Sequence, residues 1–75
     1  MSDAARKKTV NLIKANGEVS EDVINTLLTV ADGLNEHLHL YVAMFGPHAN
    51  TDYMQGVETS VSFICNVIGE LRDSS

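Results

Sequence analysis

The chain has 75 residues, a formal charge of −5 and one cysteine, Cys65. This length predicts a single helical domain over residues 1–75, near the lower limit for independent folding. One cysteine excludes an intrachain disulfide, so oligomerisation is the expected way to complete so small a core. No apolar run is long enough to span a membrane and the basic N-terminus lacks the apolar segment of a signal peptide. We therefore expect a cytoplasmic protein with no membrane contact.

The charge is unevenly divided along the chain. Residues 1–17 hold four cationic residues against one acidic residue, a sum of +3, whereas residues 18–75 hold nine acidic residues against one cationic residue, a sum of −8. Phosphate contacts require Lys and Arg, so general nucleic-acid binding is not expected. The segment Arg6, Lys7 and Lys8 is the one electropositive cluster, and it predicts either a solvated helix face or a site for an anion.

Residues 3–15 or so predict a short first helix that carries few apolar side chains. Ser2 or Asp3 can cap its start, and Asn16-Gly17 supplies residues that tolerate a left-handed turn at its end. A helix with so little apolar surface cannot form a core by itself. We expect it to dock on the rest of the chain or on a neighbouring subunit.

A second helix is predicted over about residues 20–45, from Ser20, whose hydroxyl can cap it, to the break at Gly46. A third is predicted over about residues 52–72, with Asp52 as its cap. The connection between them is about six residues, which is short enough to force an antiparallel hairpin.

Both long helices carry two apolar stripes at the three- and four-residue spacing of one helix face. The first pair of stripes predicts the hairpin seam: Ile24, Leu27, Ala31, Leu34, Leu38, Tyr41 and Phe45 against Met54, Val57, Val61, Ile64, Ile68 and Leu71. The second pair has no partner in a lone hairpin and predicts an oligomer or partner interface: Val30, Gly33, His37, Leu40, Met44, Gly56, Ser60, Phe63 and Val67. The predicted fold is therefore all-α, a short N-terminal helix plus a long antiparallel helical hairpin, oligomerising into a helical bundle as a dimer or larger assembly.

Two glycines stand inside these second stripes, where each costs its helix about 1 kcal/mol relative to alanine. Antiparallel pairing about the middle of the turn places Gly56 opposite Tyr41 and Gly33 opposite Ile64. We therefore expect each glycine to make room for a bulky side chain across the hairpin.

No metal, cofactor or catalytic site is predicted. His37 and His39 point about 200° apart on a helix and cannot share an ion. Cys65 lies in an apolar stretch with no nearby cation, which predicts a small buried side chain rather than a nucleophile. Asp32 and Glu36 share a face and are expected to be solvated. Without an acid–base pair or a glycine-rich phosphate loop, we expect no enzymatic activity.

The general plan of a short helix followed by a hairpin is similar to that of two groups of small proteins. In the segment Ile64–Arg72 the chain loosely resembles co-chaperones of type III secretion needle subunits. It also resembles, in plan, phage proteins that oligomerise and sequester cyclic nucleotides, and on that reading Arg6 to Lys8 are the anion contacts. The chain carries no diagnostic motif of either group, so no family is identified.

These patterns favour a non-enzymatic, oligomeric interaction protein that binds and occupies a partner protein, as an inhibitor, adaptor or chaperone would. The alternative is sequestration of a small anionic ligand, such as a cyclic nucleotide, at a subunit interface lined by the basic first helix. Arg6, Lys7 and Lys8 would then contact the anion, and Tyr41 and Tyr53 would stack on its ring. A purely structural assembly subunit is a third possibility.

Overall fold

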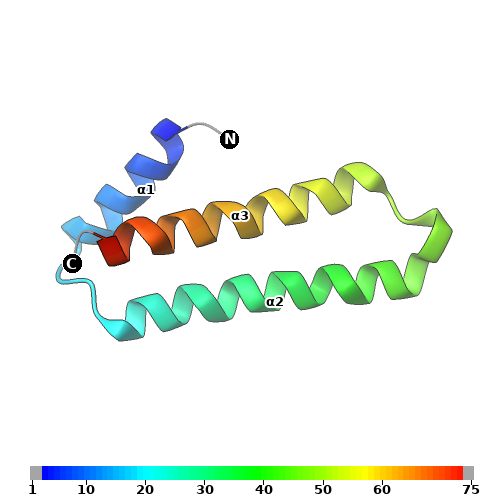
Figure 1. The fold of residues 1–75 in the computed structure, drawn as a ribbon, viewed down its shortest axis with the longest axis horizontal. Helices are drawn as coiled ribbons and strands as arrows, with labels where there is room; N and C mark the ends of the chain where they lie inside the picture. The colour runs from blue at the N-terminus through cyan, green and yellow to red at the C-terminus, as the bar shows by residue number, and fades with distance from the viewer. Residues whose placement is uncertain (1–2, 74–75) are drawn as a thin grey trace.

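The computed structural model describes residues 3–73, which form three α-helices (Figure 1). These are α1 (Asp3–Ala15), α2 (Glu21–Phe45) and α3 (Thr51–Asp73), with a short 3₁₀ turn, η1 (Gly46–His48), between α2 and α3. Helices α2 and α3 run antiparallel, and no strand occurs among the described residues. The predicted all-α class, with a short first helix and a long hairpin, is confirmed.

The ends of α1 and α2 form as their local sequences predict. The Ser20 hydroxyl accepts a hydrogen bond from the backbone N–H of Val23 at 3.4 Å and so caps α2. Gly17 follows α1 with φ +135° and Gly46 ends α2 with φ +52°, backbone conformations that side chains disfavour. The predicted cap Ser2 lies outside the described residues.

The start of α3 differs from the prediction. The Asn50 side chain accepts a hydrogen bond from the Tyr53 backbone N–H at 3.0 Å, so Asn50, not Asp52, caps this helix. Thr51 is already helical, which moves Asp52 into the first turn. Its carboxylate there faces the positive end of the helix dipole, a favourable but weaker role.

The core lies mainly at the end of the hairpin far from η1. Its centre consists of residues at most 4% exposed, drawn from all three helices: Val10, Ile24, Val67, Ile68 and Leu71. Two further buried residues of α2, Ala31 and Leu38, continue the seam toward the turn. The first pair of stripes predicted this seam: every member except Phe45, which is 48% exposed, is buried or half-buried.

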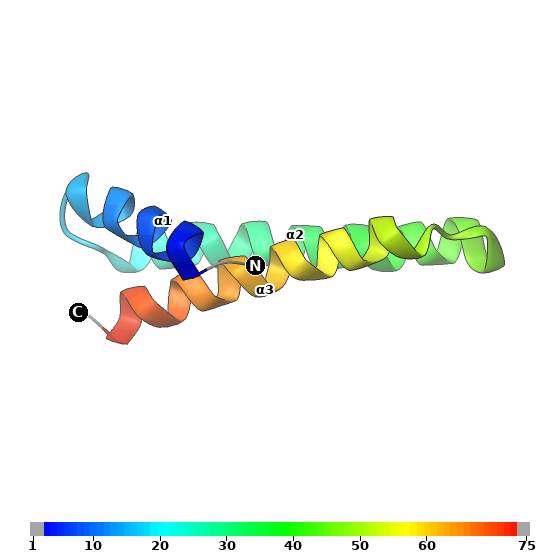
Figure 2. The same cartoon turned by 90° about the horizontal axis from the view of Figure 1, so that it is seen from above.

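Helix α1 docks beside α3 and covers only one half of the hairpin (Figures 1 and 2). Val10 is 3% exposed and packs into the core, with Ile13 at its edge. Burial of one such aliphatic side chain contributes about 1.5–3 kcal/mol. Among the described residues, the half of the hairpin next to η1 consists of α2 and α3 without α1 (Figure 2).

Candidate functional site

An exposed apolar surface runs along the hairpin and lies mostly in the half next to η1, with Val30 nearer the other end of α2. On α2, Met44 is 78% exposed, Leu40 58% and Val30 47%. We name this surface the outer face. It comprises the exposed members of the two second stripes together with Tyr53, which precedes Gly56 by three residues on the same side of α3: Val30, Gly33, His37, Leu40 and Met44 of α2 with Tyr53, Gly56 and Ser60 of α3.

The two stripes of the outer face are joined by a contact between His37 and Tyr53, whose Nε2 and hydroxyl oxygen lie 2.5 Å apart. None of its residues is Asp, Glu, Lys or Arg. The Ser60 hydroxyl donates to the Gly56 carbonyl at 2.9 Å, so its proton is bound within α3. An uncharged, largely apolar surface on an acidic protein is typical of an interaction site.

Two residues predicted for this interface are instead covered by the chain itself. Val67 is 1% exposed and packs with Val10 of α1, and Phe63 is half-buried at the edge of the same cluster. The prediction of Val67 as an interface residue is wrong, and that of Phe63 holds for only part of its side chain. The physical reason is that α1 itself occupies the second stripe of α3 along this half.

The two interior glycines do not make room for bulky neighbours. A Cβ atom built on Gly33 or Gly56 would meet no atom within 4 Å beyond the local helix. Both residues point away from the seam, so neither Ile64 nor Tyr41 approaches them closely. The predicted space-making role across the hairpin is therefore wrong, and both glycines leave shallow, exposed backbone on the outer face.

Aromatic side chains gather where the hairpin turns. The Tyr41 ring lies 4.7 Å from that of Tyr53 and 4.8 Å from that of Phe45, measured between ring centroids. The Tyr41 hydroxyl accepts a hydrogen bond from the backbone N–H of Asn50 at 2.9 Å, and the Tyr53 hydroxyl contacts His37. Sequence predicted the two tyrosines as stacking groups for a ligand; the structure places them against each other, where they brace the turn.

The basic segment is partly used inside the chain. Arg6 lies 2.8 Å from the Glu70 carboxylate on α3 and 3.4 Å from that of Asp3, and its side chain is 28% exposed. Lys7 and Lys8 are exposed. Consecutive residues of a helix point about 100° apart, which is why the three cations do not form one patch. Arg6 is therefore an ion-pair residue between α1 and α3.

The predicted anion contacts and stacking tyrosines are not brought together within one chain. The molecule extends 44 Å along its long axis, with α1 beside one end of the hairpin and the tyrosine pair at the turn (Figure 1). A single copy therefore offers no site that combines the two sets.

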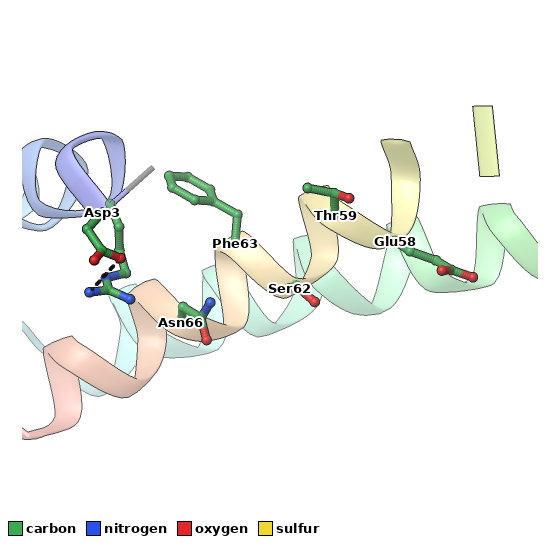
Figure 3. Close-up of a pocket in the computed structure, with 7 residues that line it drawn as sticks. Asp3, Glu58, Thr59, Ser62, Phe63 and Asn66 are labelled. Carbon is green, nitrogen blue, oxygen red and sulfur yellow. Dashed lines mark ion pairs between the residues drawn. The ribbon is translucent and has the colours of Figure 1, made fainter. Parts of the chain in front are cut away.

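A polar groove of about 370 Å³ runs between the first turn of α1 and the exposed side of α3 (Figure 3). Figure 3 shows the Phe63 ring pointing toward α1 near Asp3, with Glu58 farther along α3. The lining contains Asp3 and Glu58, and its one cation, Arg6, is already bound to two carboxylates. This groove therefore offers no cation that is free to hold an anionic ligand.

A second, more apolar groove of about 490 Å³ lies between α2 and α3 near the turn. Its lining comprises Asn35, Leu38, His39, Val42 and Ala43 of α2 with Met54 and Glu58 of α3, and we name it the turn groove. Val42 and Leu40 are two residues apart and point about 200° away from each other, so the turn groove and the outer face lie on different sides of α2. Sequence reasoning missed this site, although Leu38 and Val42 share one face at four-residue spacing.

His39 and Cys65 lie on different helices, α2 and α3. His39 and Glu58 line the same groove, and residues 3–73 contain no group of three or more His, Cys, Asp or Glu that could hold a metal. Cys65 is exposed, so the prediction that it is buried is wrong. Its apolar neighbours in sequence point to other sides of α3, because adjacent helical residues differ by about 100° in direction.

Comparison with models of known protein families, with curated proteins and with solved structures finds no match. Within residues 3–73, no helix has the length and hydropathy needed to cross a membrane.

Proposed function

We propose that this protein is a small, non-enzymatic interaction protein that assembles with itself and binds a partner protein. The observation that carries the proposal is the outer face, with Val30, Leu40 and Met44 each about half exposed or more. Apolar surface removed from water stabilises a complex by about 25 cal/mol per Å². A chain this short has few other ways to reduce that exposure.

The outer face suits a second copy of the same chain. Two molecules that each carry a formal charge of −5 repel one another, and close approach is least unfavourable where both surfaces lack charge. Two hairpins that meet through their outer faces form a four-helix arrangement, as the double stripes predict. A two-fold dimer uses the same patch on both copies, which this self-contained face allows.

The turn groove leaves apolar surface for a different protein. It lies on another side of α2 from the outer face, so self-assembly through one surface leaves the other accessible. Two separate apolar surfaces on a chain of 75 residues support a protein that assembles and also occupies a partner.

Sedimentation velocity across a range of concentrations tests the assembly. We expect the wild-type chain to self-associate and Met44→Asp to remain a monomer, because the substitution places a charge inside the contact. Leu12→Asp is the matched control: Leu12 is 58% exposed on α1, outside the outer face, and its variant should associate like wild type. A wild-type monomer at the highest concentrations, or equal association of all three proteins, would contradict the proposal.

The anionic-ligand alternative separates from this proposal in a thermal-shift assay. Ligand sequestration predicts that a nucleotide from a panel raises the Tm, and that Lys7→Ala and Lys8→Ala remove the rise. Protein binding predicts no rise with any nucleotide. Native mass spectrometry of protein purified from cells provides an independent measurement, since it reports the subunit count and any retained small molecule together.

A further inference from the structure

The turn groove has an apolar floor and an acidic surround. Leu38 is 7% exposed at its base, and Val42 and Met54 form its sides from the two helices. Glu58 of α3 and His39 of α2 belong to the same lining. Exposed Asp32 and Glu36 stand three residues before groove residues of α2, which places them one turn along the same side of that helix.

Within residues 3–73, no ion pair joins Asp32, Glu36 or Glu58 to a Lys or Arg side chain. Arg6 lines the polar groove together with Glu58, but it pairs with Asp3 and Glu70. After Lys14 the only Lys or Arg is Arg72, which lies in the last turn of α3 at the opposite end of the hairpin. In this part of the chain, the exposed carboxylates around the groove are thus left without a Lys or Arg ion-pair partner. Charge complementarity therefore points to an occupant that combines apolar and cationic side chains.

The docking of α1 shows the same chemistry within this molecule. Helix α1 packs against the hairpin through Val10 and Ile13, and its Arg6 pairs with Glu70 of α3 at 2.8 Å. A helix with an apolar stripe and a neighbouring cation thus already binds one half of this hairpin. The turn groove presents the equivalent elements on the other half, with Val42 and Met54 as apolar contacts and Glu58 as the carboxylate.

We propose that the turn groove binds an amphipathic helix of a partner protein, with apolar side chains inserted between α2 and α3 and Lys or Arg beside Glu58. This inference rests on the proposed function and specifies the chemistry of the partner. Recognition of this kind places the apolar residues of the bound helix at three- and four-residue spacing. The acidic surround selects cationic flanks and accelerates the encounter with the partner.

Fluorescence anisotropy with two designed peptides tests the proposal. Each peptide has about 18 residues, or five helical turns, with Leu at three- and four-residue spacing. One peptide carries Lys on its remaining positions and the other carries Glu. We expect the Lys peptide to bind the wild-type chain and the Glu peptide not to bind. Added salt should weaken the interaction, because it screens exposed charges.

Val42→Asp is the decisive variant. The substitution adds a negative charge, so the affinity for the Lys peptide would increase if binding were only a non-specific charge attraction. If the peptide inserts into the groove, the affinity should instead fall by about tenfold or more, because a carboxylate would be buried. Leu12→Asp adds the same charge on α1, outside both the groove and the outer face, and should bind the peptide like wild type. Val42 is 42% exposed, so its variant should keep the fold, which circular dichroism checks.

Equal affinity of Val42→Asp and Leu12→Asp for the Lys peptide would overturn the groove as the site. Equal binding of the Lys and Glu peptides would overturn the preference for a cationic helix. Self-association, on which the proposed function depends, is measured by sedimentation velocity on the same samples. The proposed function and the groove can therefore fail independently. A chain that stays monomeric but binds the Lys peptide through the groove would contradict the proposed self-association and support the groove as a binding site.

Discussion

The hydroxyl of Tyr41, in the last turns of α2, accepts a hydrogen bond from the backbone N–H of Asn50, the residue that caps α3. One aromatic side chain thus connects the end of one long helix to the start of the other. The Asn50 side chain then accepts the N–H of Tyr53, whose ring packs on Tyr41. This closed set of contacts holds the turn without any residue of α1.

Tyr41→Phe keeps the ring contacts and removes the hydroxyl acceptor. We expect the free energy of unfolding to fall by about 0.5–1.5 kcal/mol, the usual net contribution of one hydrogen bond. Urea denaturation followed by circular dichroism measures the change. An unchanged midpoint would show that water replaces the hydroxyl at this exposed turn without loss.

Leu71→Ala should be the most damaging single truncation described here, because Leu71 is 1% exposed at the centre of the core. We expect a loss of about 2–5 kcal/mol, enough to unfold much of so small a domain. Leu40→Ala is the matched control, since Leu40 is 58% exposed and its loss should stay within about 0.5 kcal/mol in the monomer. Thermal melts at low protein concentration compare the two, and similar Tm values would contradict the burial described.

Asn50→Ala and Asp52→Ala distinguish the two residues that could start α3. Loss of the Asn50 cap should cost about 1 kcal/mol, whether salt is low or high. Loss of Asp52 should cost about 0.3–1 kcal/mol at low salt only, since its interaction with the helix dipole is screened. Urea denaturation at two salt concentrations separates them. If the loss of stability in Asn50→Ala depended on salt, Asn50 would not be the cap of α3.

Replacement of the two interior glycines by alanine should stabilise the protein, whereas replacement of Gly46 at the turn should destabilise it. Gly33→Ala and Gly56→Ala should each raise the free energy of unfolding by about 0.5–1 kcal/mol, because the added Cβ meets nothing and the helix is favoured. Gly46→Ala should lower it by about 1 kcal/mol, because φ there is +52°. If either interior variant also weakens self-association, that glycine lies in the contact between copies.

The hairpin followed from the sequence because its signals are strong and local. Buried Ile24, Ala31 and Leu38 recur at seven-residue intervals, and the Ser20 cap and the Gly46 break bound the same helix. Such spacing identifies a face without knowledge of the partner. The exposure of Leu40 and Met44 was likewise expected from a second stripe with no partner inside one hairpin.

The placement of α1 could not be predicted in the same way. Val10 and Ile13 indicate that α1 has an apolar side, but periodicity does not say which helix that side meets. Its docking buries Val67 and occupies Arg6 with Glu70, which changes the roles predicted for both residues. The turn groove could not be predicted for a related reason. Val42 lies outside both stripes, and it lines a groove only because the fold brings it together with Met54 of α3.

The core unites Val10 of α1 with Leu71 of α3, two residues that are far apart in the sequence. A nascent polypeptide therefore cannot complete this cluster until the segment that carries Leu71 has left the ribosome. Until then α1 lacks part of the apolar surface on which it docks, and apolar side chains of α2 and α3 remain exposed to solvent. The complete core is thus expected to form only after all three helices have been synthesised.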